Sequence, residues 1–130
     1  MVIDTSALIA ILCDESDASQ LEAAIEHDPV RLISAGTLLE TSIVIESRFG
    51  EGGGRELDLL LHKAHFEIVA FDNEQAEVAR DAYRRYGKGR HPAALNYGDC
   101  FAYALCSSRG ESLLFKGNDF GKTDVKSALG

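Results

Sequence analysis

The chain has no long hydrophobic run. Its longest apolar stretch, Ala7–Leu12, is far shorter than the about 20 residues that a helix needs to cross a bilayer. No basic region precedes this stretch, so it is also a poor secretory signal. We therefore expect no membrane association and a cytoplasmic location.

Cysteine is scarce and lacks a pairing pattern. Cys13, Cys100 and Cys106 are odd in number and include no CxxC pair, which argues against a disulfide framework or a zinc site. We interpret all three as thiols in or near the core. His62 and His65 could share a helix face, but no HExxH motif accompanies them, so we expect both at the surface.

Internal repeats and low-complexity tracts are also missing, which excludes a solenoid. What remains is an ordinary composition, with 45% hydrophobic and 26% charged residues. A chain of 130 residues is long enough to bury one proper core. We expect residues 1–130 to form a single domain.

Positive charge is scarce except in one segment. The net charge is −8, which argues against a protein that coats nucleic acid. Residues 80–91 nevertheless read RDAYRRYGKGRH, with five basic residues and one acid, and the remainder has 8 Lys/Arg against 20 Asp/Glu. This segregation allows local contact with an anionic ligand.

Strand-like and helix-like patterns alternate along the chain. Short runs rich in Val, Ile, Leu or Phe predict buried strands at residues 1–4, 31–35, 66–71 and 112–116, with a last one near 125–129. Amphipathic patterns predict helices at residues 17–27, 37–49, 55–63, 73–86 and 97–108. The alternation predicts an α/β fold with a mainly parallel, twisted sheet of about five strands.

A glycine-rich stretch, GEGGGRE at residues 50–56, lies between two predicted helices. We interpret it as a hinge. It follows a helix instead of a strand and lacks the GK[ST] signature, so it is a poor phosphate-binding loop.

Carboxylates recur where the predicted strands end. Asp4 closes the first strand, Asp119 follows the fourth, Glu40 lies early in the helix after the second, and Asp99 lies in the first turn of the helix before the fourth. Ligands bind outside the carboxyl ends of strands in open α/β sheets. Clustered carboxylates repel one another and need protons or a cation, and oxygen ligands select hard ions such as Mg²⁺ or Mn²⁺.

Each acid also has a purely structural interpretation. Asp4 suits a helix N-cap, Asp99 a helix-dipole partner and Asp119 a turn. Glu40 is harder to explain in this way because it interrupts the apolar helix TLLETSIVIES, where an unpaired charge is costly. One shared site explains the four acids more simply than four separate structural reasons that happen to place them at the same end of the sheet.

Four segments, MVIDTSAL, RLISAGTLLE, LNYGDCFAYALC and LLFKGNDFGKTDV, together resemble the PIN domain, and within it the VapC-type toxin ribonucleases. The resemblance spans the whole chain. It implies a three-layer α/β/α sandwich, Mg²⁺-dependent endoribonuclease activity in which Mn²⁺ can replace Mg²⁺, products with 5′-phosphate and 3′-hydroxyl ends, a homodimer and a VapB-type antitoxin as partner.

By motif position, the resemblance assigns catalysis and metal binding to Asp4, Glu40, Asp99 and Asp119. Asp4 and Asp99 are expected to be the main ligands, and Glu40 or Asp119 to orient or deprotonate the attacking water. Thr5 or Ser6 and Asn96 occupy positions of supporting polar groups, and Asp124 is expected outside the first set of ligands.

The basic segment would bind the RNA substrate. We expect Arg84, Arg85, Lys88 and Arg90 to hold backbone phosphates, with Tyr86 or Tyr97 available for base stacking.

Two alternatives stay open at this point. The first is a receiver-like domain with Asp72 as phospho-acceptor and Lys116 as its lysine, although only one acid follows the first strand. The second is a binding module without catalysis.

Overall fold

The sheet has four short parallel strands. In the computed structural model, which describes residues 1–130, these are β1 (Val2–Ile3), β2 (Leu32–Ser34), β3 (Glu67–Val69) and β4 (Leu113–Leu114), in the order β3-β2-β1-β4. Val2 lies beside Leu32 on one side and Leu113 on the other. The predicted parallel α/β sheet is therefore confirmed.

The fifth predicted strand is reduced to one bridge. Ser127 pairs with Leu113 in parallel, and two backbone hydrogen bonds join this segment to Leu113, from Leu113 N to Lys126 O and from Ala128 N to Leu113 O, both 2.8 Å. Pairing of this segment with β4 is limited to that single bridge.

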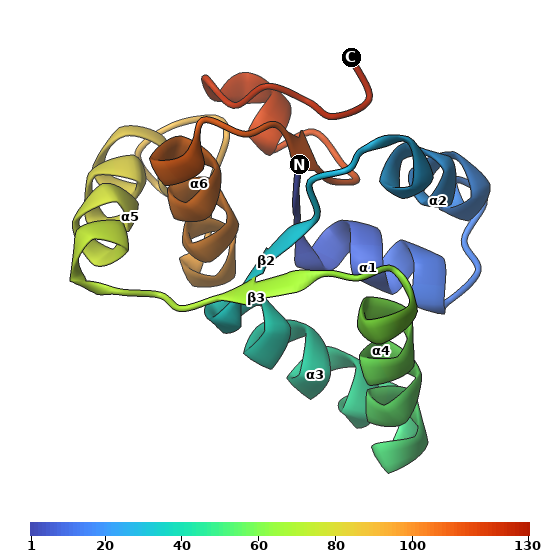
Figure 1. The fold of residues 1–130 in the computed structure, drawn as a ribbon. Coiled ribbons are helices and arrows are strands. Elements are labelled where there is room, and N and C mark those ends of the chain that lie inside the picture. Colours follow the sequence, from blue (N-terminus) through green and yellow to red (C-terminus); the bar gives the residue numbers. More distant parts are fainter.

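Six α-helices and one 3₁₀ turn connect and flank the strands (Figure 1). They are α1 (Thr5–Leu12), α2 (Ala18–His27), α3 (Ala35–Phe49), α4 (Glu51–Lys63), α5 (Asn73–Tyr86), α6 (Tyr97–Arg109) and η1 (Phe120–Lys122). Helix α1 begins immediately after the first strand. The sequence patterns did not predict this helix.

Only the first residue of the glycine-rich stretch separates two helices, so the predicted hinge is reduced to Gly50. Gly50 has φ +68° and separates α3 from α4, but the next three glycines lie inside α4. A Cβ on Gly53 would lie 3.0 Å from the carbonyl oxygen of Ile45, and a Cβ on Gly54 would lie 2.9 Å from the Glu46 carboxylate. These glycines therefore let α3 and α4 approach closely.

Both faces of the sheet are buried along β1, β2 and β4, which makes the three-layer sandwich, whereas Glu67 and Ile68 of the edge strand β3 are exposed. Ile3, Ile33 and Leu114 belong to a core formed with α1, α2 and α4. Val2, Leu32 and Leu113 belong to a second core, formed with α5 and α6. Figure 1 shows the α3–α4 pair projecting away from the sheet.

The cysteines and the two histidines lie where the sequence predicts them. All three cysteines are free, with Cys100 and Cys106 buried and Cys13 partly buried. His62 and His65 are exposed. None of the helices has the length and apolar character needed to span a membrane.

Candidate active site

Asp4 is both a helix cap and a buried acid. Its side chain is only 4% exposed, and its Oδ2 accepts hydrogen bonds from Ser6 N (3.0 Å) and Ser6 Oγ (2.6 Å) at the start of α1. Burial raises the pKa of Asp4, the hydrogen bonds from Ser6 oppose this rise, and the charge of Glu40 adds to it. Capping of α1 by Asp4 Oδ2 therefore does not prevent the same side chain from taking part in a functional site.

Glu40 is held by a chain of hydroxyl groups. Thr5 Oγ1 donates to Glu40 Oε1 (2.6 Å). Thr41 Oγ1 lies 2.9 Å from Thr5 Oγ1 and 2.8 Å from the carbonyl oxygen of Thr37. Thr41 is fully buried, so the chain anchors a partly exposed carboxylate to the interior of the protein.

The second oxygen of Glu40 faces Gly98. A Cβ on residue 98 would overlap the Glu40 carboxylate, with Oε2 as the nearest atom. Gly98 lies in the first turn of α6, where glycine costs about 1 kcal/mol relative to alanine. The glycine is therefore explained by the close approach of Glu40 to α6.

Asp99 forms a capping box with Asn96. Asn96 N donates to Asp99 Oδ2 and Asp99 N donates to Asn96 Oδ1, both at 2.9 Å. Burial and, to a smaller extent, the charges of Asp4, Glu40 and Asp119 together raise the pKa of Asp99 to about 7, against the opposing effect of the Asn96 hydrogen bond. The supporting role predicted for Asn96 is consistent with this geometry.

Asp119 is the least constrained of the four acids. It is exposed at the start of the η1 turn, and no hydrogen bond or ion pair holds its carboxylate. The loop that carries it is anchored near Asp4, because Lys116 N donates to Ser6 Oγ (3.0 Å). Lys116 Nζ pairs with Glu15 and, at 3.3 Å, with Asp17.

The four carboxylates share one electrostatic environment but do not converge on one point. Asp99 feels the charges of the other three, yet no three His, Cys, Asp or Glu side chains lie close enough to hold a metal ion. In Asp4, Glu40 and Asp99, one oxygen accepts the hydrogen bonds described above, and the second oxygen accepts none. Oxygen donors that repel one another fit a hard cation.

Asp124 belongs to a different group of side chains. Its Oδ1 accepts from the Tyr103 hydroxyl (2.6 Å), and its Oδ2 lies 3.9 Å from Arg85. No hydrogen bond links it to the four carboxylates.

The basic segment divides into free and engaged residues. Arg84, Lys88 and Arg90 are exposed and take part in no ion pair. Arg85, in contrast, donates to the Tyr103 hydroxyl (2.8 Å), pairs with Asp81 (3.2 Å) and lies over the ring of Tyr86 (4.9 Å). Arg85 is thus already engaged within the protein.

The two tyrosines proposed for stacking also differ. Tyr86 packs against His91 and Tyr103, whereas Tyr97 is 80% exposed and begins the helix that carries Asp99.

Thr41 and Gly98 are site residues that the sequence did not reveal as such. Each adjoins a predicted acid, and a glycine inside a helical pattern signals close approach of another group. The hydroxyl chain has no comparable signal, because it joins Thr5 to residues 35 and 36 positions away in the sequence.

Comparison with known proteins identifies the family of this chain. The PIN domain family model matches residues 1–126. The chain is 66% identical to Ribonuclease VapC of Mycolicibacterium smegmatis over 125 residues, which cover 96% of this chain and 97% of that protein.

Two solved structures share the fold. VapC20 of Mycobacterium tuberculosis, a sarcin-ricin loop cleaving toxin, superposes with a TM-score of 0.78 at 17% identity over 95% of each chain. VapBC2 of Rickettsia felis, bound to a fragment of its promoter DNA, has a TM-score of 0.70 at 15% identity over 93% of this chain and 90% of that one.

The family match does not support a receiver-like domain. The structure gives Asp72 a different part, since its Oδ1 accepts from Gln75 N as the cap of α5. The acidic edge of the sheet, the sandwich around it and the matched sequence lead to one conclusion: the chain belongs to the PIN domain family, among its VapC ribonucleases.

Proposed function

We propose that this chain is a metal-dependent endoribonuclease and the toxin of a type II toxin–antitoxin pair. The observation that carries the proposal is the gathering of Asp4, Glu40, Asp99 and Asp119 at one edge of the sheet, where burial of Asp99 and the three neighbouring carboxylates raise the pKa of Asp99. Such a group is costly to ionise alone and favourable to ionise beside a cation. Strongly perturbed acids in one place are typical of functional sites.

Asp4 and Asp99 are the proposed main ligands of Mg²⁺, with Mn²⁺ as a substitute. Both are held by hydrogen bonds that involve only one oxygen, Oδ2. Glu40 would complete the site through the oxygen that faces Gly98. The bound ion would supply charge neutralisation at the phosphodiester and a more acidic water.

Asp119 is the proposed group that orients or deprotonates the attacking water. It is exposed and makes no side-chain hydrogen bond, so its orientation can adjust to the substrate. Thr5 and Thr41 hold Glu40 in place while RNA binds. The products would carry 5′-phosphate and 3′-hydroxyl ends.

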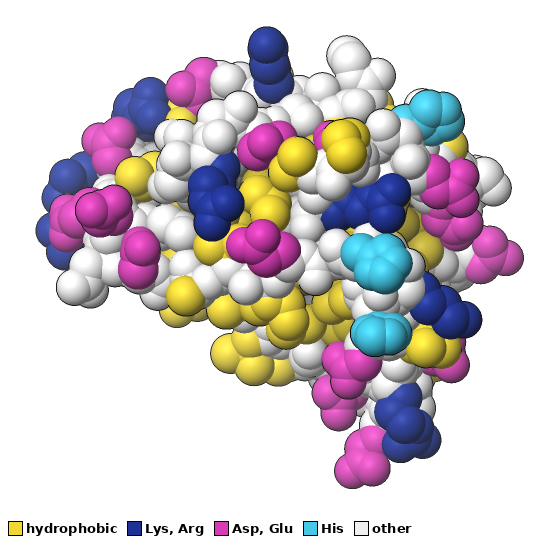
Figure 2. Space-filling model, in the orientation of Figure 1, with side chains coloured by type: hydrophobic (Ala, Val, Ile, Leu, Met, Phe, Trp, Pro, Cys, Tyr) yellow, Lys and Arg dark blue, Asp and Glu magenta, His cyan; other side chains and the backbone are white.

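We propose Arg84, Lys88 and Arg90 as the phosphate contacts for RNA, with Arg85 restricted to a structural role. The three are exposed around the end of α5. Figure 2 shows Lys and Arg side chains along the outer edge of the molecule over α5.

We propose a VapB-type antitoxin as the protein partner. We also propose that the chain itself forms a homodimer. Helix α3 presents Leu39, Ile43 and Phe49, which are 59–63% exposed. Hydrophobic side chains gather over the start of this helix in Figure 2. Helix α4 offers less, because Leu57 and Leu61 are buried in the core and Leu59 is only 44% exposed.

We place the activity in the cytoplasm, where RNA is available and the free thiols stay reduced. Residues 1–130 would act as one domain.

The test compares Asp99→Asn with Asp58→Asn, which makes the same charge change at an exposed position of α4. Asp99→Asn should abolish cleavage of a fluorogenic RNA and weaken Mn²⁺ binding measured by calorimetry. Asp58→Asn should change neither. Wild-type cleavage rates in Asp99→Asn would refute the assignment.

A further inference from the structure

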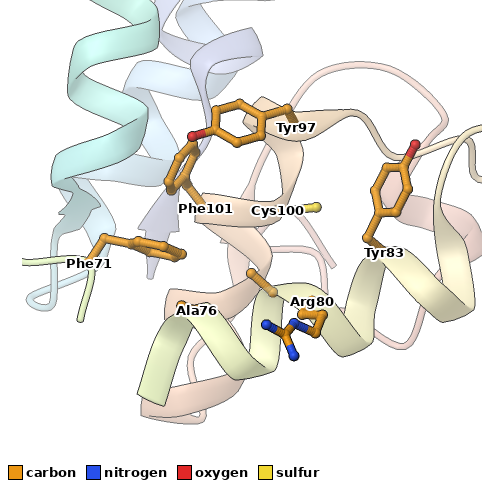
Figure 3. A pocket seen from close by; sticks show the side chains of 8 residues that line it. Phe71, Ala76, Arg80, Tyr83, Tyr97, Cys100 and Phe101 are labelled. Carbon is orange, nitrogen blue, oxygen red and sulfur yellow. The ribbon is translucent and has the colours of Figure 1, made fainter. Parts of the chain in front are cut away.

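A large hollow between α5 and α6 takes no part in the site described so far. Its volume is about 480 Å³, which is within the range of small-molecule pockets, about 300–1,000 Å³. All of its lining residues except Arg80 are hydrophobic, and Phe71, Tyr83, Tyr97 and Phe101 supply aromatic rings (Figure 3).

The hollow borders the acidic site. Tyr97 and Phe101 also line a neighbouring hollow of about 230 Å³ that includes Glu40 and Gly98. Cys100, on the floor of the larger hollow, directly follows Asp99 in the chain. A ligand that reached from the carboxylates past Tyr97 would enter the larger hollow.

The aromatic rings of the hollow pack edge to face, so that flat ring faces remain accessible to a ligand. Tyr97 meets Phe101 edge to face, with centroids 5.0 Å apart and an interplanar angle of 90°. Phe101 meets Phe71 in the same manner at 4.6 Å and 74°. Tyr83 stands on the opposite wall (Figure 3). Edge-to-face packing fixes these rings and leaves the face of Tyr97, which is 80% exposed, available for stacking.

A positively charged side chain, that of Arg80, lies at the rim of the hollow. Arg80 pairs with Glu77 at 3.9 Å, and both side chains are more than 60% exposed, so the pair contributes little and its partner is easily exchanged. Arg84 follows one helical turn later on α5. An apolar peptide would not require this charge, whereas an aromatic base joined to a phosphate uses both the rings and the cation.

We propose that this hollow binds one nucleobase of single-stranded RNA. The base belongs to a nucleotide adjacent to the scissile phosphate, which a metal ion at the carboxylates would hold. This base stacks on Tyr97 while Arg80 contacts the neighbouring phosphate. Aromatic stacking is a common way to hold single-stranded RNA without reading its sequence. This inference rests on the proposed ribonuclease function.

The test is a binding experiment without cleavage. The Asp99→Asn background, which should not cleave, is titrated in Mg²⁺ with a fluorescein-labelled single-stranded RNA, and with a series in which one base at a time is replaced by an abasic ribose. Tyr97→Ala should weaken binding of the intact RNA roughly 5- to 100-fold. Tyr97→Phe should bind like the parent, because stacking needs only the ring. Leu59→Ala, at an exposed apolar position on α4, is the matched control.

The abasic series identifies the base. At one or two adjacent positions, the abasic change should weaken binding by the parent but not by Tyr97→Ala, because both changes remove the same contact. If the two losses instead multiply at every position, no base occupies the hollow and the inference is wrong.

A second copy of the chain is the competing occupant. If Tyr97→Ala dissociates a dimer in sedimentation while RNA affinity is unchanged, the hollow is a protein interface and the proposal fails. The proposed function has its own readout, cleavage of the intact RNA by wild type with Mn²⁺. Coupling between Tyr97 and one base without any cleavage would retain the base pocket and refute the nuclease.

Discussion

Gly98 and Glu40 are in direct contact across the gap between α6 and α3, so that any side chain at position 98 would displace the Glu40 carboxylate. The two residues are brought together only by the packing of their helices. Position 98 therefore controls where one of the four acids can lie.

Gly98→Ala should lower cleavage at least tenfold and weaken Mn²⁺ binding. The added methyl group forces Glu40 or the start of α6 to move, although alanine itself favours a helix. Gly52→Ala is the control, since its Cβ would approach only the end of Arg55, at 3.8 Å. Calorimetric Mn²⁺ titration and RNA cleavage assays measure both variants. Equal behaviour of the two would show that Glu40 is not needed in its present position.

Thr41→Val should reduce cleavage several-fold and destabilise the fold by about 1 kcal/mol, because it removes a buried hydrogen-bonding group from the chain that holds Glu40. Thr37→Val is a matched control on the same helix. The Thr37 hydroxyl is buried without a hydrogen-bond partner, so its loss should be neutral or stabilising. Chemical denaturation and cleavage rates give the comparison. If Thr37→Val were the more damaging change, the hydroxyl chain would have no positioning role.

Metal-free protein should lose stability as the pH rises from about 4 to about 7. The pKa of Asp99 is raised from 3.8 to about 7 on folding, so across this interval the folded state binds more protons than the unfolded state. The free energy of unfolding then falls with rising pH and levels off above pH 7. Asp4, whose pKa is also raised, acts in the same direction.

Melting temperatures measured in EDTA across this interval test the pH effect. Asp99→Asn should show a smaller decline than wild type and a higher melting temperature at pH 7.5. Added Mn²⁺ should stabilise wild type most at the high-pH end. Parallel curves for the two proteins would mean that Asp99 does not carry the raised pKa.

Replacing Arg84 and Lys88 together by Ala should weaken RNA binding without changing Mn²⁺ affinity. Each lost phosphate contact on a single strand reduces the slope of log K against log[salt] by about 0.7, so the slope should flatten by about 1.4. Cleavage at saturating RNA should change less than cleavage at low RNA, because these groups bind the substrate. An unchanged slope would direct the search for the RNA path to Lys116 and Lys122.

Arg85→Ala should behave differently from that pair. It breaks contacts with Tyr103 and Asp124, so its main expected effect is a lower melting temperature. Thermal melting of Arg85→Ala beside Arg84→Ala distinguishes the two roles. A salt-slope change in Arg85→Ala equal to that of Arg84→Ala, without a stability loss, would restore Arg85 to the RNA contacts.

The sequence by itself determined four strands, the five helices from α2 to α6 and the positions of the acids along the chain, but it did not reveal α1. Apolar runs and amphipathic periods are local properties, and they sufficed to predict a parallel sheet. Because strands end at a common edge, they also placed Asp4 and Asp119 at that edge. Helix boundaries were less accurate at Gly52–Gly54, where close approach to α3 favours glycine at positions 53 and 54 within a helix.

Only the tertiary structure decided which side chains touch. Thr5 reaches Glu40 across 35 positions of sequence, Arg85 is engaged by Tyr103 18 positions away, and Asp124 joins that pair instead of the four carboxylates. The aromatic hollow forms because α5 packs on α6. Such contacts depend on the angle and spacing of packed helices, and these follow from the shapes of many side chains together, which no short window of sequence contains.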